Sequence, residues 1–325
     1  MMKIGIVGYG NLGRGVELAL AQTPDVQLVG IFTRRDPSTL TPLTADAGVY
    51  SMDDLPAFQG KIDVMILCGG SATDLPQQGP QCAALFNTVD SFDNHSSIPQ
   101  YFQAMDTINK QSSTASIISV GWDPGLFSLN RLLFQSCLPA GENYTFWGKG
   151  VSQGHSDAIR RVEGVQNGIQ YTIPVKQVID EIRAGNGRDY ATREKHQREC
   201  FVVATPGADL AKIEQDIKTM PAYFADYDTT VHFISEDELK QNHTAMPHGG
   251  FVIRSGETAA GTKQLMEFSL ALDSNPQFTS SILVAYARAL HRMVQEGGKG
   301  AKTVFDVPFS YLSPKDGATL RAELL

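Results

Sequence analysis

Cysteines are scarce in this 325-residue chain, and they form no recognisable pairing. The four are Cys68, Cys82, Cys137 and Cys200. No two of them are arranged as C-x-x-C, and their spacing resembles no disulfide framework. We therefore expect four reduced thiols in a cytoplasmic protein. His155 and His248 have neither the H-x-x-x-H spacing nor the neighbouring cysteine pair of a zinc site, so we expect no bound metal.

Long hydrophobic runs, a signal peptide and an excess of basic charge are also absent. No stretch approaches the roughly 20 apolar residues of a membrane-spanning helix, and the segment MMKIGIVGYG has no basic region or small-residue cleavage site. The 27 Lys and Arg residues are outnumbered by 35 Asp and Glu, which gives a net charge of −8. This balance disfavours a broad nucleic-acid-binding surface, and no G-x-S-x-G motif indicates a serine hydrolase. We therefore expect neither a membrane nor a nucleic-acid partner.

The first part of the chain alternates strand and helix patterns. Predicted strands are residues 3–7, 26–32, 62–68 and 114–120, with a further strand within 85–91. Predicted helices are residues 11–22 and 96–111. Strands that alternate with helices indicate an α/β fold of the Rossmann type, a doubly wound parallel sheet, and we assign it to residues 1–121 as a dinucleotide-binding domain.

Beyond this domain the pattern changes to longer strands with alternating apolar residues. In QLMEFSLAL, every second residue from Met266 to Leu272 is apolar and shares one face, as in an antiparallel sheet with one solvated face. We therefore expect a second, α+β domain for substrate binding and dimerisation at residues 122–277. A long helix is predicted from residue 278, and the segment 278–325 could pack back on the first domain.

A glycine motif lies between the first predicted strand and the first predicted helix. It places Gly8, Gly10 and Gly13 in the spacing G-x-G-x-x-G. The first glycine would permit a tight turn, the second would let the backbone approach a pyrophosphate, and the third would let the helix pack closely on the strand. The amino terminus of the helix would attract the phosphate charge. A strand, a glycine turn and a helix in this order favour a dinucleotide site over a plain turn.

Two arginines follow the second predicted strand, where NAD-binding proteins usually have Asp or Glu. Arg34 and Arg35 occupy this position, and Asp36 comes one residue later. Two guanidinium groups there suit the 2′-phosphate of NADP, although a solvated charged turn is the alternative. The small residues of CGGSATD, after the strand predicted at 62–68, could line the cofactor, although a plain turn fits them almost as well. The predicted cofactor-binding residues are Gly8, Tyr9, Gly10, Asn11, Leu12, Gly13, Thr33, Arg34, Arg35, Cys68, Gly69, Gly70, Ser71, Ala72 and Thr73.

Polar residues at the ends of later strands suggest a substrate site. Asp93 in SFDNH and Asp123 in GWDPG lie where strand ends face the ligand crevice of an open α/β sheet. Two carboxylates there suggest binding of an ammonium group, although each could be only a cap or turn residue. Further residues stand out because they form polar clusters in the second half of the chain, although Ser156 or Asp157 could simply cap a helix. They are Trp122, Trp147, Gln153, Gly154, His155, Ser156, Asp157, His248 and Asn275.

Taken together, these motifs resemble those of meso-diaminopimelate dehydrogenase, an NADP-dependent enzyme family of bacterial lysine synthesis. The resemblance covers nearly the whole chain and rests on GYGNLGRG, GSATD, SFD, GWDPG, SQGHSDA, TMPAYF, HTAMPHGG and NPQFT. SQGHSDA together with MPHGG is its most specific part, whereas the glycine motif alone is common to many dinucleotide-binding proteins.

The resemblance implies reversible oxidative deamination at the D-centre of meso-2,6-diaminopimelate. The product, L-2-amino-6-oxopimelate, cyclises to tetrahydrodipicolinate, and ammonia is released. The resemblance also implies a homodimer and catalytic roles for Asp93 and Asp123. The substrate-binding residues that it implies are Trp122, Trp147, Gln153, Gly154, Asp157, Thr172, Arg198, His248 and Asn275, with Arg183 as a competitor to Arg198.

Two other functions fit part of the pattern. One is another NADP-linked reductase or amino-acid dehydrogenase of the same architecture, and the other is a non-catalytic NADP-sensing regulator. Only the diaminopimelate enzyme requires a site for a second amino-acid head group, so a panel of substrates would separate the enzymes. The grouping of Asp93, Asp123 and Trp147 disfavours the regulator.

Overall fold

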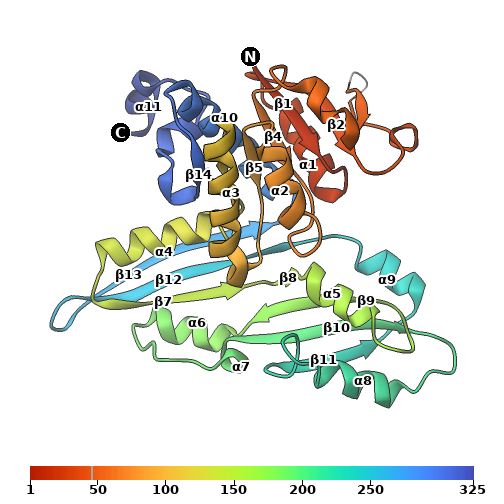
Figure 1. Cartoon of the computed structure of the whole chain (residues 1–325). Coiled ribbons are helices and arrows are strands. Elements are labelled where there is room, and N and C mark those ends of the chain that lie inside the picture. Colours follow the sequence, from red (N-terminus) through yellow and green to blue (C-terminus); the bar gives the residue numbers. More distant parts are fainter. Residues whose placement is uncertain (45–46) are drawn as a thin grey trace. The chain divides into compact units, whose positions relative to one another are not determined.

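The computed structural model describes residues 1–44 and 47–325, and the chain divides into two compact units (Figure 1). Unit 1 contains residues 1–129 and 276–325, and unit 2 contains residues 130–275. The boundaries expected from the sequence, after residues 121 and 277, differ from these by a few residues. The carboxyl-terminal segment is grouped with the amino-terminal part of the chain.

Unit 1 is built on a seven-stranded sheet in the order β14-β6-β5-β4-β1-β2-β3, with every pair parallel. Its strands are β1 (Met2–Val7), β2 (Val26–Thr33), β3 (Val49–Ser51), β4 (Val64–Leu67), β5 (Thr88–Asp90), β6 (Ala115–Ile117) and β14 (Gly300–Lys302). Its helices include α1 (Asn11–Ala21), α2 (Leu75–Ala83), α3 (Ile98–Ser112), α10 (Asn275–Gln295) and α11 (Gly317–Leu324). The chain order reverses between β1 and β4, which is the point where doubly wound sheets bind ligands. The predicted Rossmann-type sheet is confirmed.

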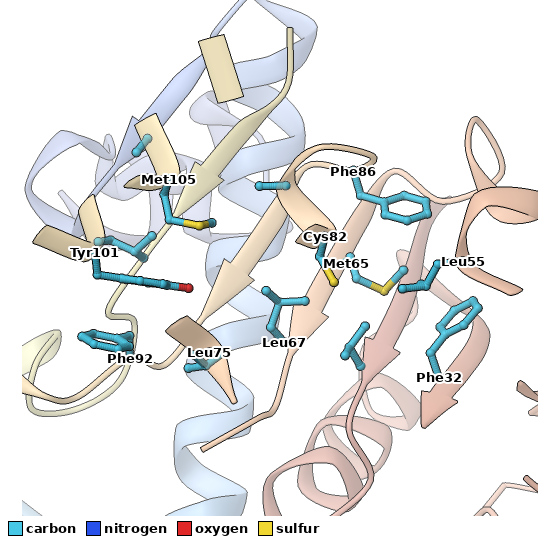
Figure 2. Close-up of a cluster of buried hydrophobic side chains, with 14 of the residues drawn as sticks. Phe32, Leu55, Met65, Leu67, Leu75, Cys82, Phe86, Phe92, Tyr101 and Met105 are labelled. Atoms are coloured by element: carbon cyan, nitrogen blue, oxygen red, sulfur yellow. The ribbon is translucent and has the colours of Figure 1, made fainter. Parts of the chain in front are cut away.

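The central strands of this sheet are continuous apolar runs because both of their faces are covered. All four residues of β4 are fully buried. Figure 2 shows the cluster on one face, where Phe32, Met65 and Leu67 of the sheet meet Cys82 of α2 and Met105 of α3. This packing fixes the carboxyl ends of β1, β2, β4 and β5, where the loops of interest begin.

Most of the predicted elements of unit 1 are present, but several are shorter or begin elsewhere. The strand predicted at 114–120 ends at Ile117, and the helix predicted from 278 begins at Asn275. The three-residue strands β3 and β14 were not predicted, because so short a strand has no measurable periodicity.

Unit 2 has two sheets. One is mixed, in the order β11-β10-β9-β8, and the other is antiparallel, in the order β13-β12-β7. The strands are β7 (Gly141–Trp147), β8 (Gly150–Val151), β9 (Val165–Pro174), β10 (His196–Ala204), β11 (Asp228–Phe233), β12 (His248–Ala259) and β13 (Thr262–Leu272). The helices are α5 (Gln153–Arg160), α6 (Lys176–Arg183), α7 (Thr192–Lys195), α8 (Leu210–Lys218) and α9 (Glu236–Asn242), while α4 (Leu126–Cys137) begins in unit 1. In β13 the half-buried Met266, Phe268 and Leu270 alternate with exposed residues, as the sequence predicted.

Two further findings concern the chain as a whole. In residues 1–44 and 47–325, no helix combines the length and the apolar character needed to cross a membrane. All four cysteines are free thiols.

Candidate functional site

The glycine loop of unit 1 lies where three strands end side by side. The N–H of Gly8 donates to the carbonyl oxygen of Phe32 at 2.9 Å, and the N–H of Cys68 donates to that of Val7 at 2.8 Å. Gly8 has a φ of +89°, in the left-handed region that favours glycine. A Cβ atom on Gly13 would overlap the carbonyl oxygen of Gly8. The structure therefore requires glycine at both positions.

Gly10 is different, because nothing within the described chain requires glycine there. Its φ is −96°, and an added Cβ would meet no atom within 4 Å. The helix α1 begins at the next residue, with no side-chain cap and no acidic residue in its first turn. The start of a helix attracts an anion, and the open space beside Gly10 would let a pyrophosphate approach the backbone. The loop fits a dinucleotide.

The two arginines after β2 lie beside this loop. The guanidinium group of Arg35 donates to the carbonyl oxygen of Tyr9 at 2.5 Å, and that of Arg34 pairs with Asp74 at 2.5 Å. Both arginines are exposed and keep further donors for a ligand. The carboxylate of Asp36 instead accepts from the N–H of Ser38 at 3.0 Å and caps its own turn. The carboxylate of Asp36 is therefore used to cap the turn that it begins.

The loop after β4 joins the same region. Its Gly70 N–H donates to Asp74 at 3.0 Å, and a Cβ atom on Gly8 would lie 3.4 Å from the carbonyl group of Cys68. The hydroxyl of Ser71 accepts from the N–H of Asp93 at 3.0 Å. The structure therefore brings together the three segments that contain the predicted cofactor-binding residues.

Sequence reasoning missed Glu17, which anchors this region from α1. Its buried carboxylate accepts from the Tyr9 hydroxyl and from the N–H groups of Leu43 at 3.1 Å and Thr44 at 2.6 Å. Burial acts to raise the pKa of Glu17, but hydrogen bonds from Thr44, Tyr9 and Leu43 hold it below its usual value. Burial, with the Glu17 carboxylate beside it, raises the pKa of Tyr9 to about 12. Glu17 is therefore an ionised anchor between the glycine loop and the segment after the arginines.

The two predicted catalytic carboxylates follow neighbouring strands of unit 1. Asp93 is exposed after β5, and Asp123 is half-buried after β6. These strands pair in parallel, so both carboxylates leave the sheet at the same edge. Trp122 is buried and packs edge-on against Phe127, with ring centroids 5.2 Å apart, so little of its indole is exposed.

In unit 2 the predicted Arg198 lies on β10 with its side chain only 6% exposed. Its guanidinium group donates to the Thr172 hydroxyl of β9 and lies 3.9 Å from the ring centroid of Tyr227. Its Nε has no hydrogen-bond partner within the described residues. Burial lowers the pKa of Arg198, and no acidic side chain of the described residues forms an ion pair with it. A buried cation without a counter-ion is costly unless an anion arrives from outside the chain.

Three histidines near Arg198 remain neutral. Burial, with the charge of Arg198 as the next cause, lowers the pKa of His155 to about 4 and that of His196 to about 3. Burial also lowers the pKa of His248. Because these rings are uncharged at neutral pH, Arg198 is the cation among them.

His196 is a second residue that sequence reasoning missed. Its Nε2 accepts a hydrogen bond from the backbone N–H of Trp147 at 2.9 Å, and the two rings stack with centroids 5.3 Å apart. This bond requires a lone pair on Nε2 and hence the neutral ring. The two residues are far apart in sequence, so no local pattern indicates the contact.

Several other predicted residues gather around the segment 246–248. Gln153 donates from its side chain to the sulfur of Met246 at 3.2 Å, and the N–H of Asn275 donates to the carbonyl oxygen of Met246 at 3.0 Å. A Cβ atom on Gly150 would lie 2.5 Å from the ring of His248. Gly150 pairs in register with Thr172, which in turn pairs with Arg198. Gly150, Thr172 and Arg198 therefore lie side by side on β8, β9 and β10, and His248 lies next to Gly150.

Two predicted substrate-binding residues of α5, Gly154 and Asp157, are exposed. Gly154 is exposed in the first turn, and a Cβ atom there would meet nothing within 4 Å. Asp157 is exposed and forms an ion pair with Arg160. Within the described ranges, no group of three or more His, Cys, Asp and Glu residues is placed to hold a metal ion.

Arg183, the competitor to Arg198, has its own carboxylate. Its Nε and Nη2 donate to the two carboxylate oxygens of Glu267 at 2.8 and 2.6 Å. Glu267 therefore neutralises Arg183.

Comparison with known proteins shows the family to which this two-unit chain belongs. The family model described as diaminopimelic acid dehydrogenase C-terminal domain matches residues 121–274. The meso-diaminopimelate D-dehydrogenases of Lysinibacillus sphaericus and Ureibacillus thermosphaericus are 63% and 64% identical to this chain, and each match covers 100% of the chain and 99% of the relative. The chain belongs to the meso-diaminopimelate D-dehydrogenase family. This finding decides against a regulator and against a different reductase family.

Solved structures of meso-diaminopimelate D-dehydrogenases and their engineered derivatives have the same fold. A mutant enzyme from Clostridium tetani, crystallised with DAP, is 60% identical with a TM-score of 0.95, and both chains are covered completely. The Corynebacterium glutamicum DAP dehydrogenase in complex with DAP is 44% identical with a TM-score of 0.93, over 100% of this chain and 99% of that one. An engineered D-amino acid dehydrogenase bound to NADP+ is 43% identical with a TM-score of 0.88, over the same shares.

Proposed function

We propose that this protein oxidises the D-centre of meso-2,6-diaminopimelate with NADP+ and water, giving L-2-amino-6-oxopimelate, ammonia, NADPH and a proton, in lysine biosynthesis. The keto product cyclises to tetrahydrodipicolinate, and the reaction is reversible. Meso-diaminopimelate D-dehydrogenases at 63% and 64% identity support the proposal. The observation that carries it in this chain is Arg198, a buried cation with no acidic partner among residues 1–44 and 47–325, since the distal carboxylate of diaminopimelate would supply that partner.

The glycine loop and the two arginines support NADP+ as the cofactor. The open space beside Gly10 and the uncapped start of α1 would hold the pyrophosphate. Arg34 and Arg35 would donate charge-assisted hydrogen bonds to the 2′-phosphate. When bound, NADP+ supplies the nicotinamide that accepts a hydride. The engineered D-amino acid dehydrogenase that is 43% identical binds NADP+.

We assign the D end of the substrate to Asp93 and Asp123. Both carboxylates leave one edge of the parallel sheet, and each can accept hydrogen bonds from an ammonium group. The amine must be neutral before the C–H bond breaks, so one carboxylate or a water must first take up a proton. We also propose that Trp147 contacts the substrate, and the His196 ring holds the backbone of that residue.

We assign the L end to the residues around Arg198. The guanidinium group would pair with the distal carboxylate, and Thr172 holds the guanidinium in place through its hydroxyl. The neutral ring of His248 would donate or accept a hydrogen bond without adding charge. We propose the same end for Gln153, Asp157 and Asn275, and contact with the substrate, at no specified end, for Trp122 and Gly154.

We also propose that the protein is a homodimer, as the family resemblance implies. Large apolar side chains on unit 2 support an association surface, because Leu132, Leu133 and Leu265 are each at least 40% exposed. Sedimentation equilibrium at micromolar concentration would give twice the chain mass of 35.3 kDa if the proposal holds. The monomer mass would contradict it.

The reaction itself is tested by NADPH formation with the meso, LL and DD isomers of diaminopimelate. We expect turnover with the meso isomer, because it alone has a D end to oxidise and an L end to be bound. A parallel series with NAD+ tests the cofactor. Turnover with the LL isomer at the rate of the meso isomer would contradict the assignment of the two ends.

A further inference from the structure

Asp90 is a buried carboxylate that the proposed reaction does not use. It is the last residue of β5 and has no exposed surface. No basic side chain of the described residues pairs with it. Burial raises its pKa to about 6, although hydrogen bonds from Phe92, Ser119 and Tyr101 act to lower it. An acidic side chain without a counter-ion is an unfavourable choice for a protein core unless its oxygens have a specific task.

The oxygens of Asp90 join the ends of two strands. One side-chain oxygen, Oδ1, accepts from the N–H of Phe92 at 3.0 Å and from the N–H of Ser119 at 3.1 Å. The main-chain oxygen accepts from the N–H of Val120 at 2.8 Å. Phe92 continues the chain after β5, and Ser119 and Val120 continue it after β6. A single residue therefore fixes the directions of both chain segments as they leave the sheet.

These two segments contain the proposed catalytic carboxylates. Asp93 directly follows Phe92, and Asp123 comes three positions after Val120. Ser119 has a φ of +57°, which is uncommon for a residue with a side chain, so its backbone needs a partner to hold it there. We infer that Asp90 is a positioning residue, which sets the separation of the Asp93 and Asp123 carboxylates by accepting backbone N–H groups from both segments. This inference rests on the proposed function of those two carboxylates.

The second side-chain oxygen has a different task. Oδ2 accepts from the hydroxyl of Tyr101 on α3 at 2.9 Å. The Tyr101 ring stacks on Phe92 with centroids 4.1 Å apart, and Figure 2 shows the two side by side. This contact secures the helix and touches neither backbone N–H group. Substitutions can therefore test the two oxygens separately. Loss of Oδ1 removes the bonds to the two backbone N–H groups, whereas Tyr101→Phe removes only the bond from the tyrosine hydroxyl to Oδ2.

The test compares Asp90→Ala, Asp90→Asn and Tyr101→Phe. Alanine removes Oδ1, whereas asparagine keeps one oxygen that can accept from both N–H groups and an amide that can face Tyr101. We expect Asp90→Ala to lower kcat about tenfold or more, since small displacements of reacting groups have effects of that size. Asp90→Asn and the matched control Tyr101→Phe should keep kcat within about threefold of the parent. The dissociation constant of NADP+ should not change in any of them.

A second measurement keeps the inference testable if Asp90→Ala does not fold. In that case Asp90→Ser, which has one oxygen on a shorter side chain, replaces it. Hydrogen exchange should accelerate at residues 91–94 and 118–123 in the alanine or serine variant, and the strand β1 should stay protected. Parental kcat in that variant would overturn the inference, as would an equal loss in Tyr101→Phe.

Two further variants separate this inference from the proposed function. Asp93→Asn and Asp123→Asn are measured in the same assay, and loss of turnover in both is expected. If both lose turnover while the alanine variant of Asp90 does not, the inference fails and the proposed function stands. Parental activity in both would refute the proposed roles and the inference together.

Discussion

Replacing His196 by glutamine should reduce the loss of unfolding free energy that the protein undergoes between pH 8 and pH 5. The His196 ring is 2% exposed, accepts the N–H of Trp147 and stacks on its indole. Burial, followed by the charges of Arg198 and Lys195, lowers its pKa from 6.5 to about 3. Glutamine cannot titrate, but its amide oxygen can still accept a hydrogen bond.

The sign and size of the effect follow from this pKa. A lowered pKa in the folded state means that the unfolded chain binds the proton more tightly, so acid favours unfolding. The contribution of His196 is complete above pH 6.5 and is lost as the pH falls towards 3. Between pH 8 and pH 5 the loss amounts to about 2 kcal/mol of unfolding free energy.

Urea unfolding of the parent and His196→Gln at pH 8 and pH 5 measures this difference. At pH 8 the variant should be less stable by about 1 kcal/mol, because an aromatic contact is lost. At pH 5 the variant should be as stable as the parent or more stable, since the parent loses about 2 kcal/mol of unfolding free energy through His196 and the variant does not. His155 and His248 titrate in both proteins, so their contributions cancel in the comparison. An equal difference at the two pH values would refute the reasoning.

Two further predictions concern the cofactor and the reacting end. Replacing both Arg34 and Arg35 by alanine should raise the KM for NADP+ about 100-fold or more and leave kcat at saturation nearly unchanged, since each charge-assisted bond contributes about 1.5–3 kcal/mol and two are lost. An unchanged ratio of kcat/KM for NADP+ over NAD+ would refute the role of the arginines. Asp123→Asn should keep the fold and NADP+ binding but lower kcat by about 100-fold or more. Full activity, with circular dichroism like that of the parent, would show that Asp123 is only a turn residue before Pro124.

The sequence predicted the structure best where the local backbone conformation can be adopted by only one type of residue. Gly8 has a positive φ, and a Cβ atom on Gly13 would overlap the backbone of Gly8, so the glycine spacing correctly indicated a tight turn between the first strand and the first helix. The alternation of predicted strands with predicted helices identified the parallel sheet, because parallel strands are joined by helical crossovers. The alternation in β13 likewise predicted a sheet with one exposed face.

The missed residues act through contacts between distant parts of the chain. Glu17 accepts N–H groups from residues 43 and 44, and Asp90 accepts one from Ser119. His196 accepts one from Trp147. A carboxylate or an imidazole that holds backbone amides leaves no periodic signal, and its burial depends on the completed fold. The carboxylate partner of Arg183 was likewise not predicted, because Glu267 lies 84 residues away in the sequence.

The central claim is that Arg198 binds the distal carboxylate while the D end reacts elsewhere. It is tested most directly by kcat/KM of Arg198→Met for meso-diaminopimelate and for D-norleucine, which has no distal head group. Because the site is buried, loss of the pair should remove about 2–5 kcal/mol, or about 30-fold to several-thousand-fold in kcat/KM for meso-diaminopimelate. In the same variant, kcat/KM for D-norleucine should stay the same or rise. Arg183→Met should leave kcat/KM unchanged for both substrates. Equal proportional losses on both substrates in Arg198→Met would contradict the claim.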